Sequence, residues 1–153
     1  TVMRAQSSGK SALGVRIMET LAGLPVTDSG WEIRPEAMLE QLLEFRERYG
    51  DVPIYITENG CSSPDQPDAS GEVQDPLRTQ YLRDYLAAGL EAMEQGVDLR
   101  GWFFWSLLDN FEWAEGYTKR FGLIYVDYET QQRIPKDSYR YVQKLIQENT
   151  LPD

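Results

Sequence analysis

Glu58 stands where a carboxylate could do chemistry. It follows a short run of β-branched and aromatic residues, Ile54–Thr57, and precedes Asn59-Gly60, a turn signal. The C-terminal ends of buried strands are where parallel α/β folds and barrels build their active sites. A carboxylate there could act as a nucleophile or in acid–base catalysis. The alternative is a structural role, in which Glu58 caps the turn or pairs with an arginine.

A second stretch, Trp102–Trp113, mixes aromatic and acidic residues and holds three of the four tryptophans. One interpretation is an aromatic core strand followed by a solvated acidic loop. The other is sugar recognition, because the C–H face of a pyranose packs on a flat ring while carboxylates accept from its hydroxyls. Trp105 and Trp113 bracket the polar residues Asp109 and Glu112, which favours the second interpretation.

The absence of histidine narrows the possible chemistry. Without imidazole, this chain cannot form Ser–His or Cys–His nucleophile pairs, or metal sites built on imidazole. Acid–base chemistry carried by this chain must use carboxylates, tyrosine, lysine or cysteine. Aspartate and glutamate, with 25 residues, are the abundant choice.

The net charge of −10 disfavours nucleic acid and anionic membranes as partners. A neutral partner such as a sugar is compatible with it, although an acidic balance can also serve solubility alone. The single cysteine, Cys61, excludes an internal disulfide and fits a reducing compartment. No signal peptide is visible and no apolar run approaches the ~18 residues that cross a membrane. We therefore expect a cytoplasmic location.

Three helices would position these residues, each predicted from apolar residues at spacings of three and four. The first has a proline in its first turn and a glycine after its end, both typical positions. Residues 1–24 have a weak pattern and are predicted to be a loop followed by a short helix. The predicted helices are Pro35–Tyr49, Asp75 to about Gln95, and Ser138–Asn149.

Strands are predicted between these helices. Two buried strands, Pro53–Thr57 and Leu99–Leu108, alternate with the helices, which indicates parallel βα units with Glu58 and Asp109 at the same end. No linker divides the chain, so residues 1–153 are expected to belong to one domain. A long surface loop, a short strand and a turn are further predicted at Cys61–Asp75, Phe121–Tyr128 and Thr130–Arg133.

Two of these motifs resemble glycoside hydrolase family 1. Ile56–Gly60 matches the family's nucleophile signature at the end of barrel strand seven. Trp105–Tyr117, continued by Lys119–Tyr128, resembles the segment after strand eight. Gly30–Ile33 is also similar to the family, and the resemblance runs from about residue 27 to the C-terminus. Two motifs in the family's order and spacing make the resemblance very specific.

The resemblance implies a fold and a missing part. Family 1 enzymes are (β/α)₈ TIM barrels, and such a barrel needs roughly 250 residues. The chain is therefore expected to be the C-terminal portion, the last two βα units, with no separate second domain. Two strands cannot close a barrel and would leave open edges. The N-terminal portion of the barrel is expected to come from a separate chain.

The resemblance also implies roles for five residues. Glu58 would be the catalytic nucleophile and form the covalent glycosyl-enzyme. Trp105 would form the platform beneath the sugar, and Glu112 would bond the O4 and O6 hydroxyls. Trp113 would donate its indole N–H to O3, and Phe121 would help to line the pocket. The family needs neither a metal nor an organic cofactor.

The implied function is a retaining β-glycosidase, β-glucosidase-like, acting on unphosphorylated sugars, since a carboxylate at Glu112 would repel a phosphate. The Asn-Glu-Pro segment that supplies the family's acid/base is absent from this sequence. The usual histidine after the nucleophile loop is replaced by Tyr85. One alternative is a catalytically silent fragment that acts as a half-barrel association module. A carbohydrate-binding module using Trp105 and Trp113 would leave Ile56–Gly60 unexplained.

Overall fold

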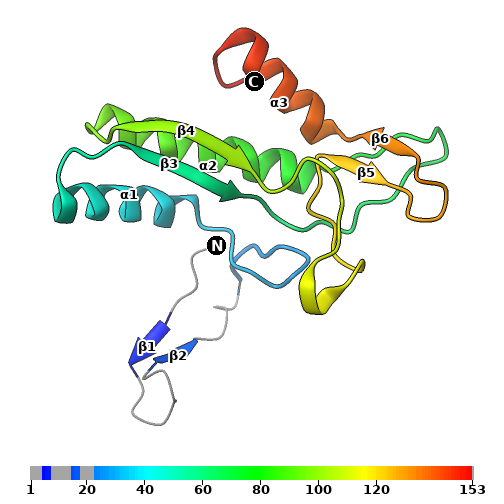
Figure 1. Ribbon diagram of the computed structural model, residues 1–153, viewed down its shortest axis with the longest axis horizontal. Coiled ribbons are helices and arrows are strands. Elements are labelled where there is room, and N and C mark those ends of the chain that lie inside the picture. The colour runs from blue at the N-terminus through cyan, green and yellow to red at the C-terminus, as the bar shows by residue number, and fades with distance from the viewer. Residues whose placement is uncertain (1–4, 8–14, 18–22, 153) are drawn as a thin grey trace.

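The computed structural model describes residues 5–7, 15–17 and 23–152. Strands and helices alternate through its central part, and a short hairpin precedes the last helix (Figure 1). In chain order the elements are β1 (Ala5–Ser7), β2 (Val15–Ile17), α1 (Pro35–Tyr49), β3 (Ile54–Asn59), α2 (Pro76–Glu94), β4 (Leu99–Phe104), the 3₁₀ turn η1 (Trp113–Glu115), β5 (Ile124–Val126), β6 (Arg133–Pro135) and α3 (Asp137–Glu148).

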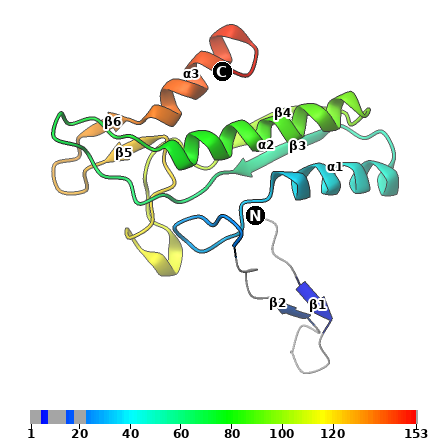
Figure 2. The ribbon, with the colours of Figure 1, turned by 180° about the vertical axis from the view of Figure 1, so that it is seen from behind.

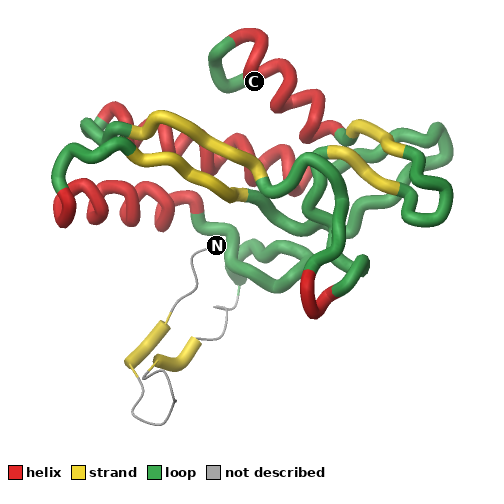
Figure 3. The backbone as a smooth tube through the Cα atoms, in the orientation of Figure 1, coloured by secondary structure: helices red, strands yellow, loops and turns green. Residues whose placement is uncertain are grey.

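The central unit is the pair β3 and β4, which are parallel neighbours joined by α2. This confirms the predicted parallel βα arrangement. Both arrows point toward the same end of the molecule in Figure 1, so the segments that begin at Gly60 and Trp105 leave the sheet together. Figure 3 shows the long loops gathered at that end. Glu58 and Asp109 lie there, as the sequence predicts.

Helices cover one face of this sheet (Figure 2). One apolar cluster joins Leu42 of α1, Ala92 of α2 and Val97 to the inward side chains Ile54 and Ile56 of β3. Burial of this apolar surface is the main favourable contribution to packing the helices on the sheet. A second cluster joins α2 to α3 and the loops at the strand ends: Cys61, Tyr81, Leu82, Tyr85, Leu123 and Val142.

The other face of the sheet is open in the described part of the chain. Tyr55 of β3 and Phe103 of β4 are 53 % and 59 % exposed. The Tyr55 ring lies over Gly101, where any added Cβ would crowd it. Within the described residues, β3 and β4 pair only with each other, so both outer edges are free. A two-stranded sheet with one bare face is an incomplete layer.

Several sequence predictions differ from the structure. The strand predicted over Leu99–Leu108 ends at Phe104, because the backbone beyond it changes partner: Ser106 N–H donates to Phe121 O, at 3.1 Å, instead of to β3. The predicted turn at Thr130–Arg133 is displaced, since residues 128–130 form the turn and Arg133 begins β6. Helix α3 begins and ends one residue before its predicted bounds.

The N-terminal prediction is wrong where it can be checked. Residues 1–24 were expected to form a loop and a short helix, but β1 and β2 form an antiparallel pair with Ala5 opposite Ile17. Two β-branched residues, Val15 and Ile17, alternate with Arg16, a spacing that favours a strand over a helix. Residues 1–4, 8–14 and 18–22 of that prediction lie outside the described ranges.

Candidate active site

Glu58 is the penultimate residue of β3 and is exposed. Its carboxylate makes no hydrogen bond or ion pair with another residue in the described ranges. Neither alternative role, a cap for the turn or a partner for an arginine, is therefore seen there. The following residue points the opposite way: Asn59 is buried and its Nδ2 donates to the Tyr81 hydroxyl at 3.3 Å. The pairing register of β3 and β4 shifts between Ile56 and Asn59, so the alternation that turns Ile54 and Ile56 toward the helices is interrupted there, and Glu58 is exposed while Asn59 is buried.

Tyr85, which replaces the family's usual histidine, belongs to the packing behind this strand end. Its ring stacks on Tyr81 with centroids 4.1 Å apart. Its hydroxyl accepts a hydrogen bond from the Arg34 N–H at 3.0 Å. Burial raises the pKa of both tyrosines. The two tyrosines are therefore uncharged packing residues behind the strand end, and the hydroxyl of Tyr81 accepts a hydrogen bond from Asn59.

The ends of β3 and β4 are joined by their backbones. Trp105 N–H donates to Asn59 O at 2.9 Å. A Cβ built on Gly60 would overlap the carbonyl oxygen of Trp105. Glycine is required there because the two backbones approach so closely that there is no room for a Cβ atom. The peptide bond between Trp105 and Ser106 is cis. The nucleophile candidate and the tryptophan platform candidate are thus fixed on adjoining strand ends.

Gly60→Ala should be strongly destabilising, by about 3 kcal/mol, because two backbones would have to separate. The measurement is the free energy of unfolding in urea. Gly71→Ala is the contrast: its Cβ would meet no atom within 4 Å, although φ is +83°. That variant should lose only about 1–2 kcal/mol from the left-handed backbone. Equal losses at both glycines would show that the contact with Trp105 is not tight.

The loop after β4 carries Glu112 and Trp113. Ser106 Oγ accepts from Asn110 Nδ2 at 2.9 Å, which shapes its first turn. Glu112 N–H donates to Gly116 O at 2.7 Å, so 112–116 forms a tight loop around η1. The Oε2 atom of Glu112 is buried and has no hydrogen-bond partner within the described ranges. An unpaired carboxylate oxygen of this kind is ready to accept from a ligand hydroxyl.

The three aromatic candidates lie in different environments. Trp113 is 82 % exposed and has a φ of +41°, which is an uncommon backbone conformation for a bulky residue. Trp105 is 36 % exposed at the end of the sheet. Phe121 is 4 % exposed, and its ring packs against Trp31 with centroids 5.8 Å apart. In the described structure Phe121 supports the loop, and its contact with a sugar stays a prediction.

A buried network of charges links the loops behind the site. Lys136 is fully buried and donates to Asp65 at 2.5 Å and to Asp109 at 2.8 Å. Asp109 also accepts from Arg120 at 2.6 Å. Arg78 pairs with Asp65 at 2.7 Å and with Asp75. Three carboxylates therefore meet three cations, as buried charges require.

Burial perturbs the ionisation of this network. It lowers the pKa of Lys136, against the opposing effect of Asp65 and Asp109. It raises the pKa of Asp75, although Arg78 and the N–H and hydroxyl of Ser138 favour the charged form. Asp75 was expected to begin helix α2, and it precedes Pro76, but its side chain does not cap the helix. Its two oxygens instead accept hydrogen bonds from Arg78 and Ser138.

Sequence reasoning missed most of this network. Asp109 was singled out beside the tryptophans, but Asp65, Arg78 and Lys136 were not. The Asp75-x-x-Arg78 spacing at a helix start is a signal that could have revealed one pair. Lys136 and Asp65 are 71 residues apart, so no local pattern connects them.

Comparison with known proteins identifies the family. The sequence profile of Glycosyl hydrolase family 1 matches residues 4–151. The chain belongs to glycosyl hydrolase family 1. The chain is 48 % identical to β-glucosidase A of Thermotoga maritima over 130 residues, 85 % of this chain and 29 % of the relative. It is 42 % identical to 6-phospho-β-galactosidase 1 of Streptococcus pneumoniae over 149 residues, 95 % of this chain and 31 % of the relative.

Solved family 1 structures match the fold closely. The family 1 β-glucosidase from Thermotoga maritima superposes with a TM-score of 0.91 at 42 % identity, covering 99 % of this chain and 34 % of that structure. The same enzyme in complex with glucoimidazole superposes with a TM-score of 0.88 at 43 % identity, covering 96 % and 32 %. These neighbours are TIM-barrel β-glucosidases. The chain spans about a third of their length and is therefore a fragment of such a barrel.

The described residues contain no group of three or more histidine, cysteine, aspartate or glutamate side chains arranged to hold a metal ion. No helix among them is long and apolar enough to cross a membrane. Cys61 is fully buried, and burial raises the pKa of its thiol to about 12.

Proposed function

We propose that this chain is the nucleophile-bearing portion of a retaining β-glycosidase that acts on β-glucosides or related unphosphorylated sugars. The observation that carries the proposal is the junction of β3 and β4. Glu58, the penultimate residue of one strand, is exposed and has no hydrogen-bond or ion-pair partner among the described residues, and the other strand leads into the loop that carries Glu112. In a double displacement one carboxylate attacks the anomeric carbon and a second carboxyl group protonates the leaving oxygen.

In this proposal each side chain has one task. Glu58 forms and later releases the covalent glycosyl-enzyme. Trp105 supports the sugar ring from the strand end, and Trp113 donates its indole N–H to O3. Glu112 accepts from O4 and O6, which fits its buried and unpaired Oε2. Strain in the backbone of Trp113 supports a functional role, because such strain collects at binding sites.

Electrostatic repulsion by Glu112 favours an unphosphorylated sugar as the substrate. A phosphate on O6 would meet the carboxylate of Glu112, and like charges at this range repel strongly where water is excluded. Overall similarity does not make this choice, since the relatives include both a β-glucosidase and a 6-phospho-β-galactosidase. The choice rests on Glu112 alone.

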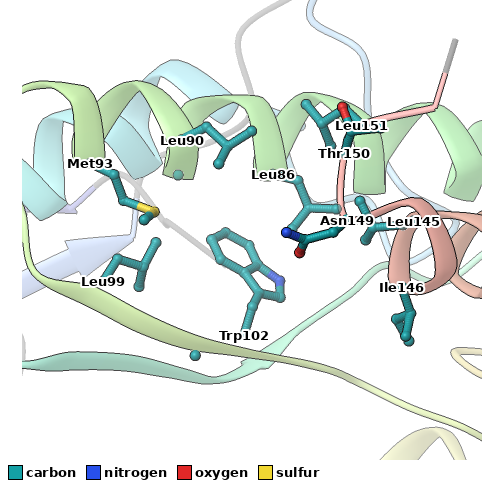
Figure 4. Close-up of a pocket in the computed structure, with 12 residues that line it drawn as sticks. Leu86, Leu90, Met93, Leu99, Trp102, Leu145, Ile146, Asn149, Thr150 and Leu151 are labelled. Atoms are coloured by element: carbon teal, nitrogen blue, oxygen red, sulfur yellow. The ribbon is translucent and has the colours of Figure 1, made fainter.

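The acid/base must come from elsewhere in the barrel, and we propose that a separate chain, the N-terminal portion, supplies it. No described strand pairs with the outer edge of β4, and an apolar groove of about 420 Å³ lies beside it between α2 and α3. Figure 4 shows Trp102 of β4 standing between the two helices in this groove. A neighbouring strand and helix of the barrel would cover it. Its apolar lining includes Leu86, Leu90, Met93, Leu99, Trp102 and Ile146.

The test uses the assembled enzyme, meaning this chain together with the N-terminal portion of the barrel. It should hydrolyse an aryl β-glucoside, and the first sugar released should be the β anomer, followed by NMR before mutarotation. The 6-phosphorylated analogue should be turned over at least about tenfold less efficiently. Release of the α anomer would refute the retaining mechanism, and a preference for the phosphorylated sugar would refute the proposed substrate class. Intact mass spectrometry of the purified sample would show whether a second chain is present.

Glu112→Ala in the assembled enzyme should lower kcat/KM for the aryl glucoside by at least about tenfold. Each charge-assisted hydrogen bond to a hydroxyl contributes about 1.5–3 kcal/mol, and two would be lost. Steady-state kinetics measures the effect. Glu129→Ala, an exposed carboxylate in the turn between β5 and β6, is the control and should leave the kinetics unchanged. An unaltered kcat/KM in Glu112→Ala would show that this side chain does not touch the sugar.

A further inference from the structure

Arg78 is a buried side chain that touches both halves of the candidate active site. It lies in α2 and is 1 % exposed. Its Nε donates to the carbonyl oxygen of Cys61 at 3.2 Å, in the segment that follows Glu58. One of its terminal nitrogens donates to the carbonyl oxygen of Arg120 at 2.8 Å, where the loop of Glu112 closes. The guanidinium therefore bridges two backbone segments that carry different functional residues.

The orientation of this guanidinium is fixed from the other side. Asp75 accepts from Nη1, and Asp65 accepts from Nη2 at 2.7 Å. The same oxygen of Asp65 is held by Lys136, at 2.5 Å, which leaves the carboxylate little freedom. A guanidinium donates in one rigid plane, so fixing two of its nitrogens on carboxylates aims the remaining N–H groups at the two carbonyls.

The backbone at Arg120 is held by several hydrogen bonds. Its carbonyl oxygen accepts from Arg78 and also from the Ser63 N–H at 3.2 Å. The next residue accepts from Ser106 N–H at 3.1 Å, so this short segment lies between the nucleophile loop and the loop after β4. The Arg120 side chain is itself anchored on Asp109 at 2.6 Å and lies over the Tyr125 ring, 4.0 Å from its centroid. A shift at Arg78 would therefore reach both loops.

We propose that Arg78 is a positioning residue: it sets the place of the Glu112 loop relative to Glu58, so that one sugar can reach both carboxylates. The inference rests on the proposed function and adds a residue to it that touches no substrate. Lysine at this position would keep the charge but not the planar fork, and could not hold two carbonyls and two carboxylates together. Displacement of a positioned group by about an ångström is enough to weaken catalysis.

The experiment compares two substrates, an aryl β-glucoside and its 6-deoxy analogue, in the assembled enzyme. The unaltered enzyme should prefer the glucoside by about tenfold or more in kcat/KM, because the analogue cannot bond Glu112 at O6. In Arg78→Lys this preference should fall by about fivefold or more. A purely structural loss lowers the amount of active enzyme and affects both substrates equally, so the ratio separates the two roles. Arg83→Lys, exposed on the same helix, is the matched control and should keep the ratio.

A lowered rate with an unchanged ratio in Arg78→Lys overturns the positioning role, and so does unchanged activity. If that variant gives no soluble protein, Asp65→Asn is measured in its place. It keeps one oxygen for Arg78 and Lys136 and puts its amide where Oδ1 has no partner in the described residues. An unchanged ratio there also overturns the proposal. If the unaltered enzyme hydrolyses no glucoside, the proposed function fails and the positioning role fails with it.

Discussion

The Glu58→Gly variant of the assembled enzyme should lose hydrolysis of β-glucosides by roughly 10⁴-fold or more, the scale of removing a covalent nucleophile. The proposed retaining mechanism needs a covalent intermediate, and this variant would lack the carboxylate that is proposed to form it. Formate or azide should restore cleavage of activated aryl glucosides by filling the space of the missing side chain. Glu58 is exposed at a strand end, so the variant should fold as well as the unaltered chain.

A covalent trap gives independent evidence for the same residue. A 2-deoxy-2-fluoro glucoside with a good leaving group slows the breakdown of the glycosyl-enzyme, because fluorine destabilises the oxocarbenium-like transition state. After digestion, the added sugar mass should lie on the peptide that contains Ile56–Gly60. Glu58→Gly should prevent labelling, while Glu129→Gln, an exposed carboxylate on the β5–β6 turn, should not. A label on any other peptide would remove the assignment of the nucleophile.

The parts of the fold that the sequence predicts well have local signals. Helix α1 matches its predicted bounds because Pro35 suits the first turn and Gly50, with a φ of +80°, ends it. The parallel pair of β3 and β4 follows from strand–helix–strand order, for which the crossover is nearly always the same. The end of this strand is predicted less well: the turn signal at Asn59-Gly60 ends the predicted strand at Thr57, whereas β3 continues to Asn59.

The parts that the sequence does not predict are held by distant partners. Strand β6 has only three residues and ends in Pro135, and it exists because β5 pairs with it. Lys136 would be read as a surface residue, yet it is fully buried between Asp65 and Asp109. Such a site becomes visible only when loops far apart in the chain have been placed side by side. The positioning role proposed for Arg78 belongs to this second class.

This chain on its own should show no glycosidase activity above background. A general acid contributes typically about 10²–10⁴-fold, and ordinary glycosides have leaving groups that need one. Asp109 is not available for the task in the described structure, because its side chain is buried and both of its oxygens are occupied by Lys136 and Arg120. Glu115 is exposed on the same loop, so it is the residue to test if activity appears.

The measurement is hydrolysis of an alkyl β-glucoside by the purified chain, before and after the N-terminal portion of the barrel is added. Activity should appear only in the mixture and should rise with the amount of the added portion until the two are equimolar. An aryl glucoside with a very acidic leaving group is the control, because it departs with little protonation and depends less on the missing acid. Full activity from the chain alone, abolished by Glu115→Gln, would mean that both catalytic carboxyl groups lie within these 153 residues. Activity that survives Glu115→Gln and needs no second portion would contradict the half-barrel proposal itself. In the described part of the chain both outer edges of β3 and β4 are free and one face of the pair is exposed, which is the reason we expect activity only after the second portion is added.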